Sequence, residues 1–353
     1  MRWLQLILAL LIGALPAAAA DFPKVLPGVA LNFPDDHGAH PGFRTEWWYV
    51  TGWLNTADGK DLGFQVTFFR SRPDMDAKNP SRFAPAQILF AHAALSDPAV
   101  GRLLHDERSA RTGFGIAEAA TGDAGIVLRD WSLKRSPDDR FVAKVATPDF
   151  ALDLAFAPTQ PVFLQGDAGV SQKGDKPEEA SYYYSMPHLA VSGTLMRSGK
   201  PEAVTGEAWL DREWSSDFLS SDAVGWDWTG LNFDDGGALV AFRVRGKDDA
   251  TLWAGGSFRR PDGTVARLGP ADVTLDPVRR WTSPRTQALY PVEQVLTIRL
   301  PEGERRWPLT PLFDDQELDG RSGGLPVYWE GAVRVPGGRG YLELTGYAAP
   351  LTL

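Results

Sequence analysis

Apolar and polar residues alternate in short runs along most of the chain, whereas the period of an amphipathic helix is hard to find after residue 20. The runs are about five to nine residues long, and turn-forming residues interrupt them every eight to twelve positions or so. Many short strands with regular turns are typical of β-sandwiches and β-barrels. We therefore predict an all-β protein.

Turn signals predict how the strands pair and where the chain divides. Two alternating runs within 46–70 flank Asp58-Gly59 and predict a β-hairpin. Further turns are predicted at 138–139, 198–201, 234–237 and 261–263. A new hairpin series follows a polar, serine-rich segment, so we predict an N-terminal domain at 21–218 and a C-terminal domain at 219–353. Each has enough strands to close a barrel and so remove exposed edges.

The stretch 165–181 has no periodicity and many turn formers. It predicts a long loop. Two readings stay open: a lid over a barrel mouth, or a disordered excursion.

The first twenty residues have the pattern of a signal peptide. Arg2 precedes a short apolar run, and Ala18 to Ala20 form a small-residue cleavage site. We expect cleavage near Ala20 and a periplasmic or otherwise extracytoplasmic location; an uncleaved anchor is the alternative. No later stretch approaches the roughly 18 apolar residues that a membrane helix needs, so an integral membrane protein is not expected.

Composition narrows the function classes. The chain has no cysteine, which excludes disulfides and cysteine nucleophiles, and its net charge of −9 argues against nucleic acid as a partner. The sequence shows no nucleophile elbow, phosphate-binding loop, dinucleotide fingerprint or zinc-protease motif. We expect no metal and no cofactor, so any catalysis rests on Asp, Glu, His and Tyr, with the thirteen tryptophans available to shape a pocket.

The first candidate site lies in the strand around Glu46. Alternation puts Glu46 and Trp48 on one face and Trp47 on the other, and both faces are largely apolar. Glu46 either pairs with Arg44 on its own face or has a raised pKa and serves as a proton donor. In the preceding loop, His37 and His40 are either metal ligands or solvated loop residues.

The second candidate site lies in 206–218. Trp209, Asp211 and two glutamates share one face of the predicted strand, and Arg212 lies on the other. Carboxylates stacked in a barrel interior require that one be protonated or bound to a cation. An ion-pair latch between the domains and a plain solvent-exposed face are the alternatives.

Two further segments combine aromatic and titratable residues. In 225–233, Trp226 and Trp228 lie on one face and Asp227 on the other, where it is either tied to an arginine or functional. In 180–192, His188 shares a face with Tyr184 and other apolar residues, which suits a hydrophobic ligand with one polar end. A hydrogen-bonded core histidine is the alternative.

Five segments together carry a family resemblance: "DHGAHPGFRTEWWYVTGWL", "FAHAALSD", "YYYSMPHLAVSGTL", "GEAWLDREWSSD" and "GWDWTGLNF". They resemble the carotenoid 1,2-hydratase family, especially its AttH-type branch of exported lipocalin-like proteins. The resemblance implies two lipocalin-like antiparallel β-barrels. It also implies an enzyme that adds water to an isoprenoid double bond or folds a polyene, or, in the AttH branch, a protein that accompanies ABC-transporter components. The resemblance assigns no hydratase catalytic role to a particular residue of this chain.

Two functional hypotheses remain open from the sequence. In the first, a hydrophobic ligand enters a barrel lumen or the cleft between the barrels, and Glu46 or Asp211 donates a proton in a hydratase- or hydrolase-like reaction. His188 or Tyr184 would position water, and Trp47, Trp48 and Trp209 would stabilise a cation. In the second, the same barrels carry a lipid without changing it. In a third reading, the lumen is filled by its own side chains.

Overall fold

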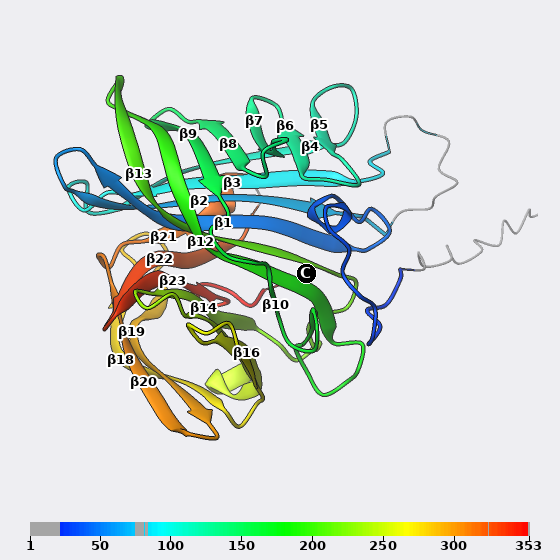
Figure 1. Ribbon diagram of the computed structural model, residues 1–353. Coiled ribbons are helices and arrows are strands. Elements are labelled where there is room, and N and C mark those ends of the chain that lie inside the picture. The colour runs from blue at the N-terminus through cyan, green and yellow to red at the C-terminus, as the bar shows by residue number, and fades with distance from the viewer. Residues whose placement is uncertain (1–21, 75–80, 82–83, 324, 352–353) are drawn as a thin grey trace, which may run out of the picture.

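The computed structural model describes residues 22–74, 81, 84–323 and 325–351. The predicted all-β fold is confirmed: the described residues form 23 strands in two antiparallel sheets, with three short 3₁₀ turns and no α-helix (Figure 1). None of these turns is long and apolar enough to cross a membrane. The predicted signal peptide lies outside the described residues.

The first sheet nearly closes into a barrel. Its strand order is β4-β3-β2-β1-β13-β12-β9-β8-β7-β6-β5, and β10 and β11 also pair with β12. The strands are β1 (Thr45–Thr56), β2 (Asp61–Ser71), β3 (Ile88–Ser96), β4 (Leu103–Arg111), β5 (Ala117–Ala119), β6 (Gly125–Leu128), β7 (Trp131–Arg135), β8 (Phe141–Ala146), β9 (Phe150–Ala157), β10 (Phe163–Leu164), β11 (Val170–Gln172), β12 (Ala180–Arg197) and β13 (Lys200–Ser215).

The second sheet has the order β17-β16-β15-β14-β23-β22-β20-β19-β18, and β21 pairs with β22. Its strands are β14 (Gly225–Phe233), β15 (Ala238–Arg245), β16 (Thr251–Arg259), β17 (Val265–Leu268), β18 (Val273–Thr282), β19 (Leu289–Leu300), β20 (Gly303–Pro311), β21 (Glu317–Asp319), β22 (Val327–Val335) and β23 (Gly338–Thr345). The 3₁₀ turns are η1 (Asp35–His37), η2 (Lys247–Asp249) and η3 (Gly320–Gly323).

Each predicted turn joins two paired strands. The first hairpin is β1–β2, and the others are β7–β8, β12–β13, β14–β15 and β16–β17. The predicted domain boundary at 218–219 falls in the connection between β13 and β14. The excursion alternative for 165–181 is wrong, because the segment contains β11 and its Gln165, Ser171 and Lys173 side chains are buried.

Strand β1 is buried on both faces because two cores meet at it. Trp48, Val50 and Leu54 point into the first barrel, whose interior is filled by side chains, including several large aromatic ones. Tyr49 and Trp53 point the other way and join a cluster between the two sheets. A separate core fills the second domain.

The two sheets pack directly on each other. Figure 1 shows β14, β22 and β23 beside β1, β2 and β12, and these strands are in contact. Hydrogen bonds cross the contact, such as that from Trp228 Nε1 to the Tyr183 hydroxyl at 3.0 Å. The packing is close: a methyl group at Gly63 would lie 2.6 Å from the Tyr341 hydroxyl. We call this contact region the interdomain layer.

Candidate functional site

Glu46 lies at one end of the first barrel, fully buried between two guanidinium groups. Arg70 and Arg212 each donate a hydrogen bond to its carboxylate, and the His40 backbone N–H donates another at 2.9 Å. Burial alone would raise the pKa of Glu46, but Arg212, the hydrogen bond with His40 and Arg70 outweigh it and hold the pKa well below its usual range. Glu46 is therefore a carboxylate and not a proton donor at neutral pH.

The pairing expected between Glu46 and Arg44 is wrong. Arg44 lies one residue before β1, and its guanidinium packs 4.2 Å from the Phe22 ring. Arg70 is the residue directly opposite Glu46 on β2, and Arg212 faces Trp48 from β13. Cross-strand neighbours supply the counter-ions because they project to the same face at short distance.

Aromatic rings enclose this ion cluster. The Arg212 guanidinium lies 3.9 Å from the Trp48 ring centroid and 5.1 Å from that of Trp214. The His40 ring stacks on the Trp214 ring with a centroid distance of 3.9 Å. His37 is buried and His40 is partly buried, so neither is a fully solvated loop residue.

Tyr184 lies at the same end of the barrel, where its hydroxyl is 2.6 Å from Nδ1 of the buried His37. Burial lowers the pKa of His37 to about 4, so the ring is neutral. No group of three or more potential metal ligands occurs in the described part of the chain. Glu46, Trp48 and Tyr184 thus lie in one buried cluster of ion pairs, hydrogen bonds and aromatic rings, which we call the Glu46 cluster.

Asp211 lies on β13, next to β1, and its side chain points to the opposite face of the sheet from Glu46, into the interdomain layer. Its carboxyl group accepts hydrogen bonds from the Tyr183 hydroxyl at 2.7 Å, the Ser185 hydroxyl at 2.5 Å and Trp209 Nε1 at 2.6 Å. Burial raises the pKa of Asp211 to about 7, against the lowering effect of these hydrogen bonds. Asp211 is therefore substantially protonated at neutral pH.

The second domain adds two glutamates to the layer. Glu330 on β22 and Glu343 on β23 lie directly opposite each other, and Glu343 is also opposite Trp228. Burial, together with the neighbouring Asp211, raises the pKa of Glu343 to about 8, against the lowering effect of an interaction with Trp226. Burial and the facing Glu343 raise the pKa of Glu330 well above its usual value. Like-charged residues in direct register cannot both ionise cheaply.

A lysine enters the layer close to Asp211, but it pairs with a different carboxylate, Glu213. Lys173 Nζ lies 3.1 Å from Glu213 and packs 4.2 Å from the Phe242 ring centroid. Among the described residues, no lysine, arginine or histidine lies within ion-pair distance of Asp211, Glu330 or Glu343. The face of β13 that carries Trp209, Asp211 and Glu213 thus points into the layer, and neither into a barrel interior nor into solvent.

Several buried polar atoms of the layer make no hydrogen bond of standard geometry among the described residues. They are the Tyr49 and Tyr341 hydroxyls, Gln65 Oε1, His92 Nε2 and Glu330 Oε1. The Tyr49 hydroxyl and the Glu330 carboxyl nevertheless interact with each other. Buried polar atoms in a native protein are normally hydrogen-bonded, and a buried water or a polar group of a ligand would satisfy the others.

His188 does not lie where alternation placed it. A β-bulge between Met186 and Leu189 shifts the register, and His188 has a φ of +54°. Its ring leaves the Tyr184 face and bridges the domains, with Nδ1 2.7 Å from Glu207 and Nε2 2.9 Å from the Gly237 carbonyl oxygen. The structure therefore does not bring His188 to Asp211 or to Tyr184.

Asp227 faces away from the layer, as alternation predicted, and is tied to arginines. Its carboxylate accepts hydrogen bonds from Arg243 at 2.8 Å, Arg245 at 2.9 Å and the Tyr347 hydroxyl at 2.9 Å. Asp227 is thus separated from Trp226 and Trp228 and belongs to a second compensated ion cluster.

Of the predicted tryptophans, Trp209 and Trp228 lie within the layer, with ring centroids 6.4 Å apart. Trp47 and Trp226 lie at its edge, only partly buried, and both pack on Phe218 from the connection between the domains.

Sequence reasoning missed Tyr183, Glu330, Glu343 and Lys173. The two glutamates carried a usable signal, since each is an acidic residue within an apolar strand, in "YWEGAV" and "YLELTG". The lysine carried none, because it lies in the stretch without periodicity.

Comparisons with known proteins agree with this architecture. The AttH-like family matches residues 24–347. The crystal structure of an AttH candidate from Nitrosomonas europaea is 50% identical, covers 92% of this chain and 100% of that one, and superposes with a TM-score of 0.86. No curated protein sequence matches the chain.

Two more distant structures share the fold alone. Kievitone hydratase from Nectria haematococca is 14% identical over 94% of this chain and 97% of its own, with a TM-score of 0.69. CghA is 14% identical over 95% of this chain and 98% of its own, with a TM-score of 0.53. The family match spans nearly the whole described chain. The protein belongs to the AttH-like family, with a lipocalin-like fold related to that of hydratases.

Proposed function

We propose that the protein binds a hydrophobic, isoprenoid- or lipid-like ligand in the interdomain layer and that Asp211 donates a proton to it. One observation carries the proposal: Asp211 is buried among Tyr183, Trp209 and Trp228 with a pKa of about 7 and with none of the described cationic side chains within ion-pair distance. A general acid works best when its pKa lies near the operating pH. Glu46, the other predicted acid, is excluded by its two arginines.

The reaction class that fits this arrangement is hydration of a carbon–carbon double bond. The Asp211 carboxyl protonates one carbon, and a carbocation forms on the other. The faces of Trp209 and Trp228 stabilise that cation, by about 2 kcal/mol when water is excluded. A water molecule then bonds to the cation through its oxygen and returns a proton to the Asp211 carboxylate, so the net change is addition of one water.

Isotope labelling tests the proposal. The full chain is incubated with geraniol-type isoprenoid probes in ¹⁸O-labelled water, and mass spectrometry measures oxygen incorporation. Asp211→Asn, which keeps the shape of the neutral acid, should lose about 10² to 10⁴ of the rate. It should keep the affinity for the probe, measured by quenching of tryptophan fluorescence. Unchanged turnover in this variant would refute Asp211 as the acid.

A carrier function is the second candidate, and dense packing of the layer favours it. The hydrogen bond between Trp228 and Tyr183 already closes the layer, so a ligand enters only when the sheets separate, which suits slow release. Native mass spectrometry of gently purified protein should then show a bound lipid. Wild type and Asp211→Asn would carry it equally, and neither would convert it.

We propose in addition that the protein works outside the cytoplasmic membrane and serves an ABC transport system. The signal-peptide pattern supports the first point and the AttH-like membership the second. N-terminal sequencing of the protein from a cell fractionation should give Asp21 as the first residue. Crosslinking in the producing cells should capture transporter subunits; retention of residues 1–20 in a cytoplasmic protein would contradict the location.

A further inference from the structure

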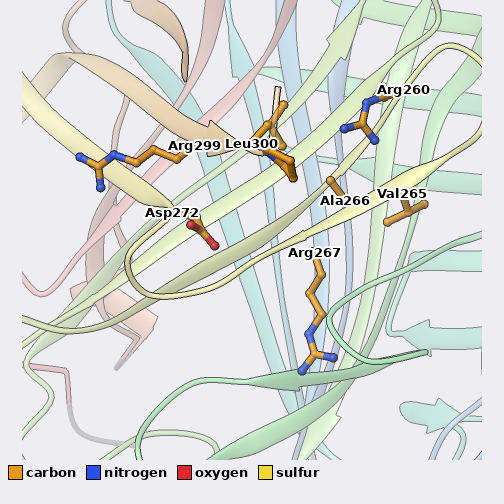
Figure 2. Close-up of a pocket in the computed structure, with 8 residues that line it drawn as sticks. Arg260, Val265, Ala266, Arg267, Asp272, Arg299 and Leu300 are labelled. Carbon is orange, nitrogen blue, oxygen red and sulfur yellow. The ribbon is translucent and has the colours of Figure 1, made fainter. Parts of the chain in front are cut away.

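Two hollows flank the β16–β17 hairpin, away from Asp211. One has a volume of about 710 Å³ and lies between this hairpin and the segment 160–168 of the first domain. The other, of about 600 Å³, shares Arg260, Val265 and Arg267 with it (Figure 2). The larger hollow thus opens where the two domains meet.

A buried arginine lines the larger hollow without a counter-ion. Arg259 is 6% exposed, donates hydrogen bonds to the Pro161 carbonyl at 2.9 Å and to the Gln160 side chain, and lies 5.0 Å from the Phe163 ring centroid. None of the described carboxylates lies within ion-pair distance of it. Burial lowers the pKa of Arg259, as expected for a charge placed out of water without a partner.

This arginine differs from the other buried ones. Arg70, Arg212, Arg243 and Arg245 each pair with Glu46 or Asp227. A buried charge is costly unless it is paired. An anionic group in the hollow would supply the charge that the protein itself does not.

The rim and wall of the hollow add to this chemistry. Arg260 and Arg267 lie on the rim in ion pairs with Glu302 and Asp167, which are open to solvent and so exchange readily. Figure 2 shows Arg267 extending toward the first domain, where Asp167 lies 3.2 Å away. Part of the wall is apolar and consists of Pro161, Val162, Phe163, Leu164, Pro261 and Val265, while Asp262 contributes one carboxylate to the lining.

We propose that this hollow binds an anionic amphiphile: Arg259 pairs with a carboxylate or phosphate head group, and the tail lies on the apolar wall. The site goes beyond the function proposed for the interdomain layer. It uses none of the residues assigned there, so either site can exist without the other.

Titration calorimetry on the full chain tests this site, with four probes below their micellar concentrations. Oleate and oleyl phosphate carry both charge and tail, oleyl alcohol carries the tail alone, and inorganic phosphate carries the charge alone. We expect both anionic amphiphiles to bind, the tighter one identifying the head group, and the other two to bind at least about tenfold more weakly.

Variants connect the binding to Arg259. Arg259→Gln should weaken oleate binding by about tenfold or more, because a charge-assisted hydrogen bond is lost, and Arg259→Lys should recover part of it. Arg299→Gln, at an exposed arginine that lines only the smaller hollow, is the matched control and should leave the affinity unchanged. If Arg259→Gln unfolds, the exposed Arg267→Glu provides the test, with an expected loss of about threefold.

Two results would overturn the proposal. One is oleyl alcohol or inorganic phosphate that binds as tightly as oleate and loses as much affinity in Arg259→Gln. The other is an oleate affinity that neither Arg259→Gln nor Arg267→Glu changes.

Discussion

Glu46 and Asp211 are two buried carboxyl groups on neighbouring strands with opposite protonation. Tyr49, three residues after Glu46, is the direct partner of Asp211 across the β1–β13 ladder, and the two carboxyls lie on opposite faces of that wall. Glu46 has two arginines and stays charged, whereas Asp211 has only neutral donors and takes up a proton near pH 7. The comparison shows that the counter-ion, and not the depth of burial, determines which buried carboxyl can act as an acid.

The largest effect is expected from Glu46→Gln. The substitution leaves the guanidinium groups of Arg70 and Arg212 buried without their carboxylate, and breaking a buried ion pair in this way costs about 3–5 kcal/mol. Urea denaturation at pH 7 measures the loss in free energy of unfolding. Asp153→Asn, which breaks an exposed pair with Lys144, should change it only slightly. Equal effects of the two substitutions would show that the buried ion pairs of Glu46 stabilise the fold no more than an exposed pair does.

Asp211→Asn should act in the opposite direction and depend on pH. The folded pKa of Asp211, about 7, lies above the ordinary value of 3.8, so its contribution to stability is complete below about pH 4 and is lost as pH rises through 7. Relative to wild type, the variant should gain up to about 4 kcal/mol at pH 8, at about 1.36 kcal/mol per pKa unit. Denaturation at pH 4 and pH 8 tests this, since a difference that is the same at both pH values contradicts a raised pKa.

Glu343→Gln tests whether the carboxyl groups of the interdomain layer raise one another's pKa. Removing the charge opposite Glu330 should lower the pKa of Glu330, because Glu343 helps to raise it. Carbon NMR of labelled glutamate carboxyls, followed through a pH titration, measures the shift. Glu118→Gln on an exposed strand position serves as the control and should leave that titration unchanged. An unaltered Glu330 titration in Glu343→Gln would mean that the two carboxyls do not interact.

The smallest effect is expected from His188→Asn. The variant loses two hydrogen bonds, one to Glu207 in its own domain and one to Gly237 across the domain contact, each with a net value of about 1 kcal/mol. Asparagine, however, tolerates the positive φ better than most residues. Urea denaturation should show a net loss of about 1 kcal/mol. His188→Gln, which reaches as far but gains nothing at this φ, should lose more. A loss as large as that of Glu46→Gln would make His188 a principal link between the domains.

Alternation along the chain predicted which residues share a face, but not what lies opposite them. It separated Trp48 from Trp47 and Asp227 from Trp228, as the structure has them. It could not identify Arg70 as the counter-ion of Glu46, because the pairing of β1 with β2 brings together two residues that are 24 positions apart in the sequence. The layer around Asp211 was harder still, because its glutamates arrive from β22 and β23, more than a hundred residues later.

The bulge in β12 shows a second limit. An alternating pattern assumes an unbroken two-residue period, and one extra residue between Met186 and Leu189 moved His188 from one face to the other. The predicted hairpins did not suffer in this way, because turn residues act locally.

Both faces of the wall formed by β1 and β13 are packed against a core, so neither face tolerates substitution easily. One parity of residues fills the barrel, and the other builds the contact with the second domain. A single inserted or deleted residue in either strand would exchange the two sets, moving Glu46 away from its arginines and Asp211 into the barrel interior. An insertion that keeps both sets of side chains in place must therefore add residues in steps of two.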